Sequence, residues 1–331
     1  MRKFLTICVL LFAVVYVNAQ AYNNEWIDYS KTYYKFKVGS DGLYRINQSA
    51  LASFQVGLGN IPCEQFQLWR NGVQIPLYTS APSGVLPANG YIEFWGKRND
   101  GKPDKPLYKN AANQLSDVLS LETDTVAYFL TVNVAGNNLR IADAVNDIAN
   151  NTLPPEPYFM YDYRVDYQQR INFGKPVYFG EYVYSSTYDM GEFWASFDVT
   201  PTSPMQLITD SLYVAGNGPD ASLQVSVVGN SFLGSNRTVK VDINGNNIIS
   251  NNLYTINAAI LNNPVTVSQI NTPTVSFTFS DINGDINDRI AVGFVDLKYP
   301  RLFNFGNKTN FEFVLPATTQ GNYQVLLHCS I

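Results

Sequence analysis

Histidine is almost absent from this chain, whose 331 residues include only His328. Cys329 follows it directly, but neighbouring side chains of a strand point to opposite faces, so the two cannot exchange a proton. No second histidine is present to serve as the base for Cys329 or for Cys63. Because a Cys–His nucleophile requires a base within hydrogen-bond reach, the sequence predicts no catalytic residues.

Cysteine is also scarce, with three residues in all, and Cys8 lies in the apolar N-terminal stretch. Cys63 and Cys329 could pair in an oxidising compartment, but one bridge is not a disulfide framework. The sequence does not supply the geometry that a bridge requires, so this pairing stays open. We expect burial of a hydrophobic core to provide most of the stability.

Charged residues are few, at 15% of the chain, with 22 basic residues against 27 acidic ones. No cluster of basic residues offsets the net charge of -5, and an acidic surface repels phosphate backbones. We therefore expect no nucleic-acid partner.

No apolar run is long enough for a transmembrane helix. The run over residues 4–17 is shorter than the roughly 20 residues that span a bilayer. Arg2 and Lys3 precede this run and Ala19 follows it, which is the pattern of a signal peptide. We expect residues 1–19 to be cleaved off and the mature chain to be exported without spanning a membrane.

Short strands with turn residues between them make up most of what is present, and aromatic residues reach 14%. In the first half, residues 66–69 and 73–77 flank Asn71-Gly72, a dipeptide typical of tight hairpins. Residues 91–95 follow a second Asn-Gly and alternate between two faces. With a short helix over residues 47–58, this pattern predicts an N-terminal β domain over residues 20–153, containing hairpins and one or two short helices.

A polar, proline-rich stretch over residues 146–158 marks the boundary to a second domain, residues 154–331. Strand patterns and turns such as Asn244-Gly245 follow at short intervals. We interpret the chain as mainly β with two β domains, the second a β-sandwich with jelly-roll-like character. Its candidate strands are residues 177–184, 192–199, 206–214, 222–228, 238–243, 265–270, 275–279, 290–297, 311–315 and 323–328.

The densest group of carboxylates is DINGDIND, residues 281–288. Asp281, Asn283 and Asp285 occupy the alternate positions that a calcium-binding loop uses. Ile286 stands where such a loop requires glycine, and Val292 stands where it requires glutamate. A hydrophilic hairpin turn is the favoured interpretation, and a structural calcium ion at Asp281, Asn283 and Asp285 is the alternative. The sequence predicts no other cofactor.

Aromatic side chains on the polar faces of strands could stack against sugars, although aromatic residues also pack across sheets. A surface glycan-binding or adhesin module is therefore an alternative function. The residues concerned are Tyr91, Trp95, Tyr161, Tyr163, Tyr182, Tyr184 and Trp194.

Three stretches resemble the gingipain-type cysteine peptidases, in particular the type IX secretion sortases. They are WIDYSKTYYKFKVGSDGLYRI (residues 26–46), RNGVQIPLY with NGYIEFWGKRNDGKPD (70–78 and 89–104), and RIAVGFVDLKYPRLF (289–303). In that family an N-terminal β region precedes a peptidase domain that carries the catalytic residues. The sortases remove a sorting signal from secreted cargo and attach the cargo to surface lipopolysaccharide.

No position in this sequence matches the catalytic residues of the family. The resemblance implies the non-catalytic N-terminal portion of a sortase-like peptidase, truncated before the catalytic domain that it would support or occlude. It also implies an outer-membrane, cell-surface or extracellular location in a Gram-negative bacterium. The implied partners are type IX secretion components or a secreted cargo protein.

Overall fold

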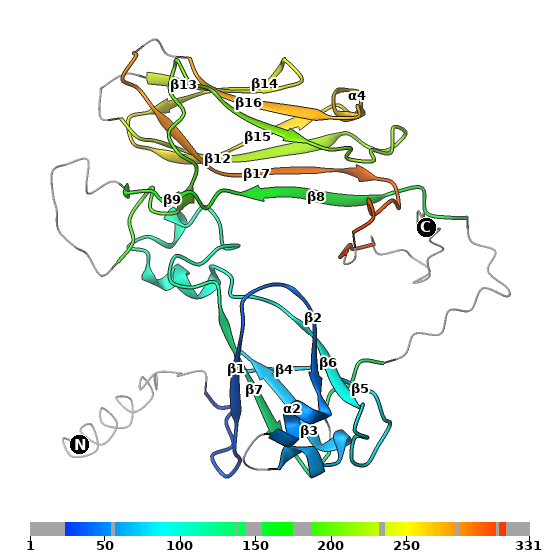
Figure 1. Ribbon diagram of the computed structural model, residues 1–331. Helices are drawn as coiled ribbons and strands as arrows, with labels where there is room; N and C mark the ends of the chain where they lie inside the picture. Colours follow the sequence, from blue (N-terminus) through cyan, green and yellow to red (C-terminus); the bar gives the residue numbers. More distant parts are fainter. Residues whose placement is uncertain are drawn as a thin grey trace, which may run out of the picture. The chain divides into compact units, whose positions relative to one another are not determined.

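The computed structural model describes residues 24–53, 57–136, 138–142, 154–174, 187–231, 236–282, 285–308 and 311–315 (Figure 1). These residues form antiparallel sheets with a few short helices, which confirms the prediction of a mainly β protein. The chain divides into two compact units. The first comprises Met1–Arg98 and Thr125–Ala144, and the second comprises Asn99–Asp124 and Val145–Ile331.

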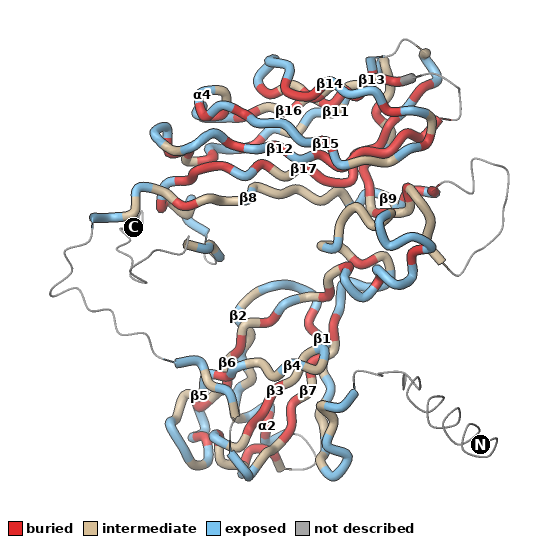
Figure 2. The backbone as a smooth tube through the Cα atoms, turned by 180° about the vertical axis from the view of Figure 1, so that it is seen from behind, coloured by how far each residue is buried: buried red, intermediate tan, exposed pale blue. Residues whose placement is uncertain are grey.

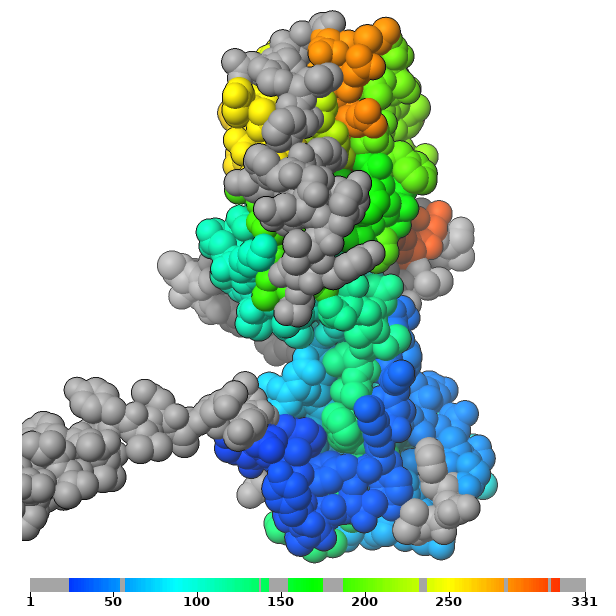
Figure 3. Space-filling model, turned by 90° about the vertical axis from the view of Figure 1, so that its left-hand side faces the viewer, coloured from blue at the N-terminus to red at the C-terminus, as the bar shows by residue number. Residues whose placement is uncertain are grey.

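The segment Asn99–Asp124 belongs to the second unit although both flanking stretches belong to the first. Trp194 donates its indole N–H to the Ser120 carbonyl (2.9 Å), and the Tyr108 hydroxyl donates to the Glu192 carbonyl (2.7 Å). Figure 3 shows the blue-green atoms of this segment beside the green atoms of the second unit. The sequence did not predict this arrangement. Residues 19 and 153, which end the predicted signal peptide and the predicted first domain, both lie outside the described ranges. The predicted division of the chain into contiguous domains therefore stays a prediction.

Two antiparallel sheets build the first unit, with strand orders β1-β7-β3-β4 and β2-β6-β5. The predicted hairpin is confirmed, because Arg70 pairs with Val73 and both Asn71 (φ 49°) and Gly72 (φ 77°) have the positive φ of a tight turn. The strands are β1 (Tyr34–Val38), β2 (Gly42–Asn47), β3 (Phe66–Arg70), β4 (Val73–Ile75), β5 (Tyr78–Thr79), β6 (Tyr91–Gly96) and β7 (Val126–Val132).

The core of the first unit lies between these sheets and a short helix, α2 (Gln48–Ser53), which buries Leu51 completely. Tyr128 on β7 is fully buried, and its hydroxyl accepts from the Lys97 backbone N–H (2.8 Å) and donates to the Lys97 carbonyl (3.2 Å). Short 3-10 helices are also present: η1 (Leu58–Asn60), η2 (Cys63–Gln65), η3 (Lys102–Leu107) and η4 (Ala111–Asn113), the last two in the second unit.

The second unit is a sandwich of two four-stranded antiparallel sheets, ordered β11-β16-β13-β14 and β15-β12-β17-β8 (Figure 1). Most neighbouring strands are distant in sequence, as in jelly-roll architectures, and the predicted β-sandwich is confirmed. Strands β9 and β10 form a separate two-stranded sheet. The strands are β8 (Phe159–Asp166), β9 (Arg170–Ile171), β10 (Trp194–Ala195), β11 (Met205–Thr209), β12 (Ala221–Gly229), β13 (Asn236–Ile243), β14 (Asn246–Tyr254), β15 (Ala258–Val265), β16 (Val275–Asp281) and β17 (Ile290–Arg301).

Apolar side chains fill the space between the two sheets of the sandwich, and the inner strands are the most buried parts of this unit (Figure 2). Alternate residues of β16 point inward, so Phe277 and Phe279 are fully buried. Nearly every residue of the central strand β17 is buried, and it pairs with both β12 and β8.

Two predicted strands, residues 311–315 and residues 265–270, are wrong. Residues 311–315 are described and form no strand. Strand β15 ends at Val265, and the helix α4 (Val267–Ile270) follows. Thr266 and Gln269 form a reciprocal capping box, which gives the first turn of this helix the partners that its backbone requires. The predicted strands over residues 177–184 and 323–328 and the predicted signal peptide lie outside the described residues.

Within the described part of the chain, no helix has the length and apolar character needed to cross a membrane.

Candidate functional site

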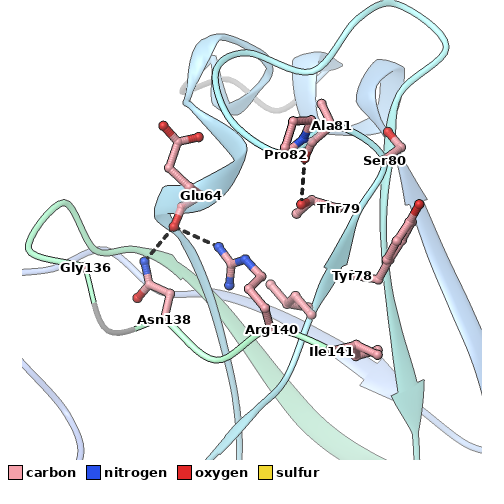
Figure 4. A pocket seen from close by; sticks show the side chains of 11 residues that line it. Glu64, Tyr78, Thr79, Ser80, Ala81, Pro82, Gly136, Asn138, Arg140 and Ile141 are labelled. Atoms are coloured by element: carbon pink, nitrogen blue, oxygen red, sulfur yellow. Dashed lines mark hydrogen bonds between the residues drawn. The ribbon is translucent and has the colours of Figure 1, made fainter. Parts of the chain in front are cut away.

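A pocket of about 540 Å³ opens on the first unit beside β5 (Figure 4). Its walls come from three stretches that are distant in sequence. These are Glu64, residues 77–82, and Gly136, Asn138, Arg140 and Ile141. The lining mixes backbone, hydroxyl, guanidinium and apolar groups, which is the composition of a binding site for a small ligand or a peptide segment.

The outer edge of β5 forms one wall of this pocket. Leu77 donates its N–H to the Leu139 carbonyl (3.2 Å) and accepts from the Ile141 N–H (2.9 Å), whereas Ser80 donates in the opposite direction, to Tyr91 on β6 (3.0 Å). Because backbone groups alternate in direction along a strand, the N–H and C=O of Thr79 point to the same edge as those of Leu77. No backbone group of the described residues pairs with Thr79 at that edge.

Arg140 contributes a guanidinium group to the opposite wall. Its Nη2 donates to the carbonyls of Cys63 (3.0 Å) and Glu64 (2.8 Å), and its Nη1 donates to the Leu139 carbonyl (2.8 Å). Partial burial lowers the pKa of Arg140, although an arginine stays charged at any physiological pH. No carboxylate in the described ranges forms an ion pair with it.

Three further side chains of the pocket, those of Glu64, Asn138 and Thr79, have local partners. The Glu64 carboxylate accepts from the Gly84 N–H (2.8 Å) and points away from Arg140 in Figure 4. Asn138 donates to the Glu64 carbonyl (2.8 Å), and the Thr79 hydroxyl donates to the Ala81 carbonyl (2.9 Å). The residues that line this pocket include no histidine and no cysteine.

Cys63 lies next to the pocket as a fully buried thiol that donates to the Ala81 carbonyl (3.3 Å). Burial raises the pKa of this thiol, which keeps it protonated and unreactive at neutral pH. Cys329, with which it could pair, and the single histidine, His328, lie outside the described residues. The pairing of Cys63 with Cys329 therefore stays open.

Two of the predicted calcium ligands have structural roles. Asp281 ends β16 and is 1% exposed, and the Asp285 carboxylate accepts from the Asn287 N–H (2.9 Å) as part of a turn. The third, Asn283, lies outside the described residues. Among the residues with a described position, no group of three or more His, Cys, Asp or Glu side chains could hold a metal ion. The calcium site stays a prediction.

Asp288, in the same loop, forms a buried ion pair with Arg237 in the sandwich. Asp288 and Arg237 each have fully buried side chains. Arg237 Nε lies 2.9 Å from Asp288 Oδ1 and 3.1 Å from Oδ2, and Arg237 Nη2 lies 2.7 Å from Oδ1. Nη2 also donates to the Ser231 carbonyl (2.9 Å). This bidentate pair connects the loop to the first residues of β13.

Four of the aromatic side chains proposed as a sugar platform make contacts within the protein. The Arg45 guanidinium covers the Tyr91 ring at 3.8 Å, and the Tyr161 ring stacks with Phe311 at 5.1 Å. Trp194 donates to Ser120 as described above, and Tyr163 packs against the sandwich core. Tyr91 and Trp95 belong to the first unit, whereas Tyr161, Tyr163 and Trp194 belong to the second. Tyr182 and Tyr184 lie outside the described residues.

Sequence reasoning missed Arg140 and Thr79 as pocket residues. Arg140 stands between two apolar residues, Leu139 and Ile141, and Thr79 follows an ordinary hairpin pattern. Their shared position depends on a parallel bridge between Leu77 and Arg140, residues that are far apart in the chain. No local signal in the sequence reports such a pairing.

Comparison with known proteins gives a likeness of fold. No protein-family model matches the sequence, and no curated protein sequence matches it. The crystal structure of dimeric latent PorU from Porphyromonas gingivalis superposes with a TM-score of 0.51 at 10% identity. That match covers 83% of this chain but only 25% of the PorU chain, so this chain spans a quarter of its length.

Other solved structures resemble this chain more weakly. A carbohydrate-binding module of the CBM36 type, in complex with calcium and xylotriose, has a TM-score of 0.26 at 11% identity, covering 40% of this chain and 98% of its own. A β-porphyranase from Bacteroides plebeius has a TM-score of 0.25 at 10% identity, covering 82% of this chain and 37% of its own. TM-scores this low support no inference about this chain. The chain has an antiparallel, two-unit β fold, and over 83% of this chain that fold is similar to latent PorU.

Proposed function

We propose that this chain is the non-catalytic N-terminal β portion of an exported, sortase-like peptidase of the gingipain type. In this role it supports or occludes a catalytic domain that these 331 residues do not include. The mature chain is located at the outer membrane, at the cell surface or in the extracellular medium. Its partners are components of type IX secretion or a secreted cargo protein.

The observation that carries this proposal is the match to latent PorU over 83% of this chain. Three separate stretches of sequence resemble the type IX secretion sortases, and they are distributed over both units. The pocket beside β5 has binding groups and no nucleophile–base pair among its lining residues, which fits a non-catalytic role.

Affinity purification tests the proposal. Tagged residues 20–331 are incubated with detergent-solubilised outer membranes of the native bacterium, and the bound proteins are identified by mass spectrometry. We expect enrichment of type IX secretion components or their cargo relative to a tagged β-sandwich of unrelated origin. Enrichment equal to that of the control would contradict the proposal.

A glycan array and a peptidase assay make the test more specific. Binding to a defined glycan that is lost in both Trp95→Ala and Trp194→Ala would favour the adhesin interpretation instead. Hydrolysis of casein by purified residues 20–331 would contradict the non-catalytic role directly.

A further inference from the structure

We propose that the pocket beside β5 binds an extended peptide, which pairs with the outer edge of β5 and places a carboxylate against Arg140. The peptide is a segment of another protein that adds a short strand to the sheet β2-β6-β5. This inference concerns a ligand of the first unit, and it does not depend on the proposed relation to a peptidase.

The edge of β5 offers a backbone pairing site that is only partly used. The parallel bridge between Leu77 and Arg140 occupies the edge at Leu77. One step along the same edge, the N–H and C=O of Thr79 face the pocket, with no backbone partner among the described residues. Unpaired edge groups of this kind are the template for strand addition, in which main-chain hydrogen bonds supply affinity.

Arg140 supplies the charge selectivity of the site. Its three hydrogen bonds go to carbonyl oxygens, which are neutral acceptors. They use only part of the five N–H donors of the guanidinium group. The one carboxylate among the lining residues, Glu64, is directed away from Arg140 and accepts from Gly84. A partly desolvated guanidinium that forms no ion pair among the described residues can bind a carboxylate, because charge-assisted hydrogen bonds are shorter and stronger than neutral ones.

The size and rim of the pocket fit a peptide better than a single ion. Its volume of about 540 Å³ lies within the range of about 300–1,000 Å³ that is usual for ligand sites. Tyr78 and Ile141, which both line the pocket, expose 37% and 43% of their surface. These apolar groups can cover the alternate side chains of an extended peptide, whereas a free anion would leave them in water.

Fluorescence anisotropy with two synthetic peptides tests the proposal on residues 20–331. One labelled peptide has seven residues of alternating threonine and valine with a central glutamate, and the second has glutamine in place of the glutamate. We expect the glutamate peptide to bind at least about tenfold more tightly, because hydrogen bonds to charged groups are stronger. We also expect Arg140→Gln to abolish that preference.

Lys37→Gln is the matched control, because it removes one positive charge from an exposed position of β1 in the same unit and outside the pocket. It should leave the preference unchanged. Equal affinities for the two peptides, no binding of either, or a preference that persists in Arg140→Gln would each overturn the proposal.

Arg140 also holds the carbonyls of Cys63 and Glu64, so its replacement could disturb the fold. Amide hydrogen exchange on the unaltered chain avoids that difficulty. A saturating concentration of the glutamate peptide should slow exchange at Thr79, whose N–H becomes paired, while leaving the Ser80 amide, already bonded to Tyr91, unchanged. Unaltered exchange at Thr79 would overturn the strand-addition geometry even where an acidic peptide binds.

Discussion

The ion pair between Arg237 and Asp288 allows a sharp prediction about stability. Both side chains are fully buried, and three N–O distances between 2.7 and 3.1 Å join them. Asp288→Asn removes the negative charge while keeping the size of the side chain. Because Arg237 would remain charged in the sandwich, the substitution leaves an uncompensated buried charge.

We expect this substitution to lower the free energy of unfolding by about 3–5 kcal/mol. That is a large part of the roughly 5–15 kcal/mol by which a domain is usually stable. For a unit of this size, each kcal/mol lowers the melting temperature by about 2–4 °C, so a decrease of about 6–20 °C should follow. Differential scanning calorimetry of the mature chain measures it.

Two controls separate the buried charge from other effects. Lys298→Gln breaks a pair with Asp162 in which both side chains are about half exposed, and we expect it to cost less than about 1 kcal/mol. The double variant Arg237→Met, Asp288→Leu removes both charges and should be more stable than Asp288→Asn. A loss below about 1 kcal/mol for Asp288→Asn, or a double variant that is less stable than it, would refute the reasoning.

Three further predictions concern the second unit. Burial raises the pKa of the Glu192 carboxyl above its ordinary 4.5, so the folded state keeps this proton to a higher pH than the unfolded state does. The stability that the protonated carboxyl contributes is therefore lost as pH rises from about 4.5. In urea denaturation between pH 4.5 and 7, Glu192→Gln should gain stability relative to the parent. Equal pH profiles would contradict this. A methyl group at Gly229 would collide with Arg237 Nη1 and the Thr255 carbonyl. Gly229→Ala should therefore destabilise the sandwich by at least as much as overpacking usually does, about 1–3 kcal/mol. A calorimetric melting temperature equal to that of the parent would argue against this close packing. The calcium interpretation predicts that millimolar calcium raises the melting temperature and that Asp285→Ala abolishes the rise, whereas no rise in the parent chain would exclude it.

The parts of the fold that the sequence predicted have strong local signals. Asn71-Gly72 closes its hairpin because both residues tolerate a positive φ. The expected alternation of residues 91–95 appears in β6, where Ile92 and Phe94 are fully buried. The β-sandwich follows from closely spaced short strands with one apolar face each.

The features that the sequence did not predict depend on strand pairing, helix capping and tertiary contacts. Strand β14 (Asn246–Tyr254) is rich in asparagine, which disfavours strands, but its pairing with β13 from Asn236 to Ile243 overrides that preference. The predicted strand over residues 265–270 failed because a capping box at Thr266 starts a helix there. The pocket beside β5 joins three stretches that only tertiary pairing brings together, so no spacing in the sequence could indicate it.

The central claim is that this chain is a non-catalytic β portion that acts on a peptidase domain. The most direct measurement mixes purified residues 20–331 with the separately produced catalytic domain of a gingipain-type sortase and records the rate of peptide cleavage. We predict that the chain alone cleaves nothing and that it changes the rate of the catalytic domain in a saturable manner. Cleavage by the chain alone, or a rate that an unrelated β-sandwich alters to the same extent, would contradict the account.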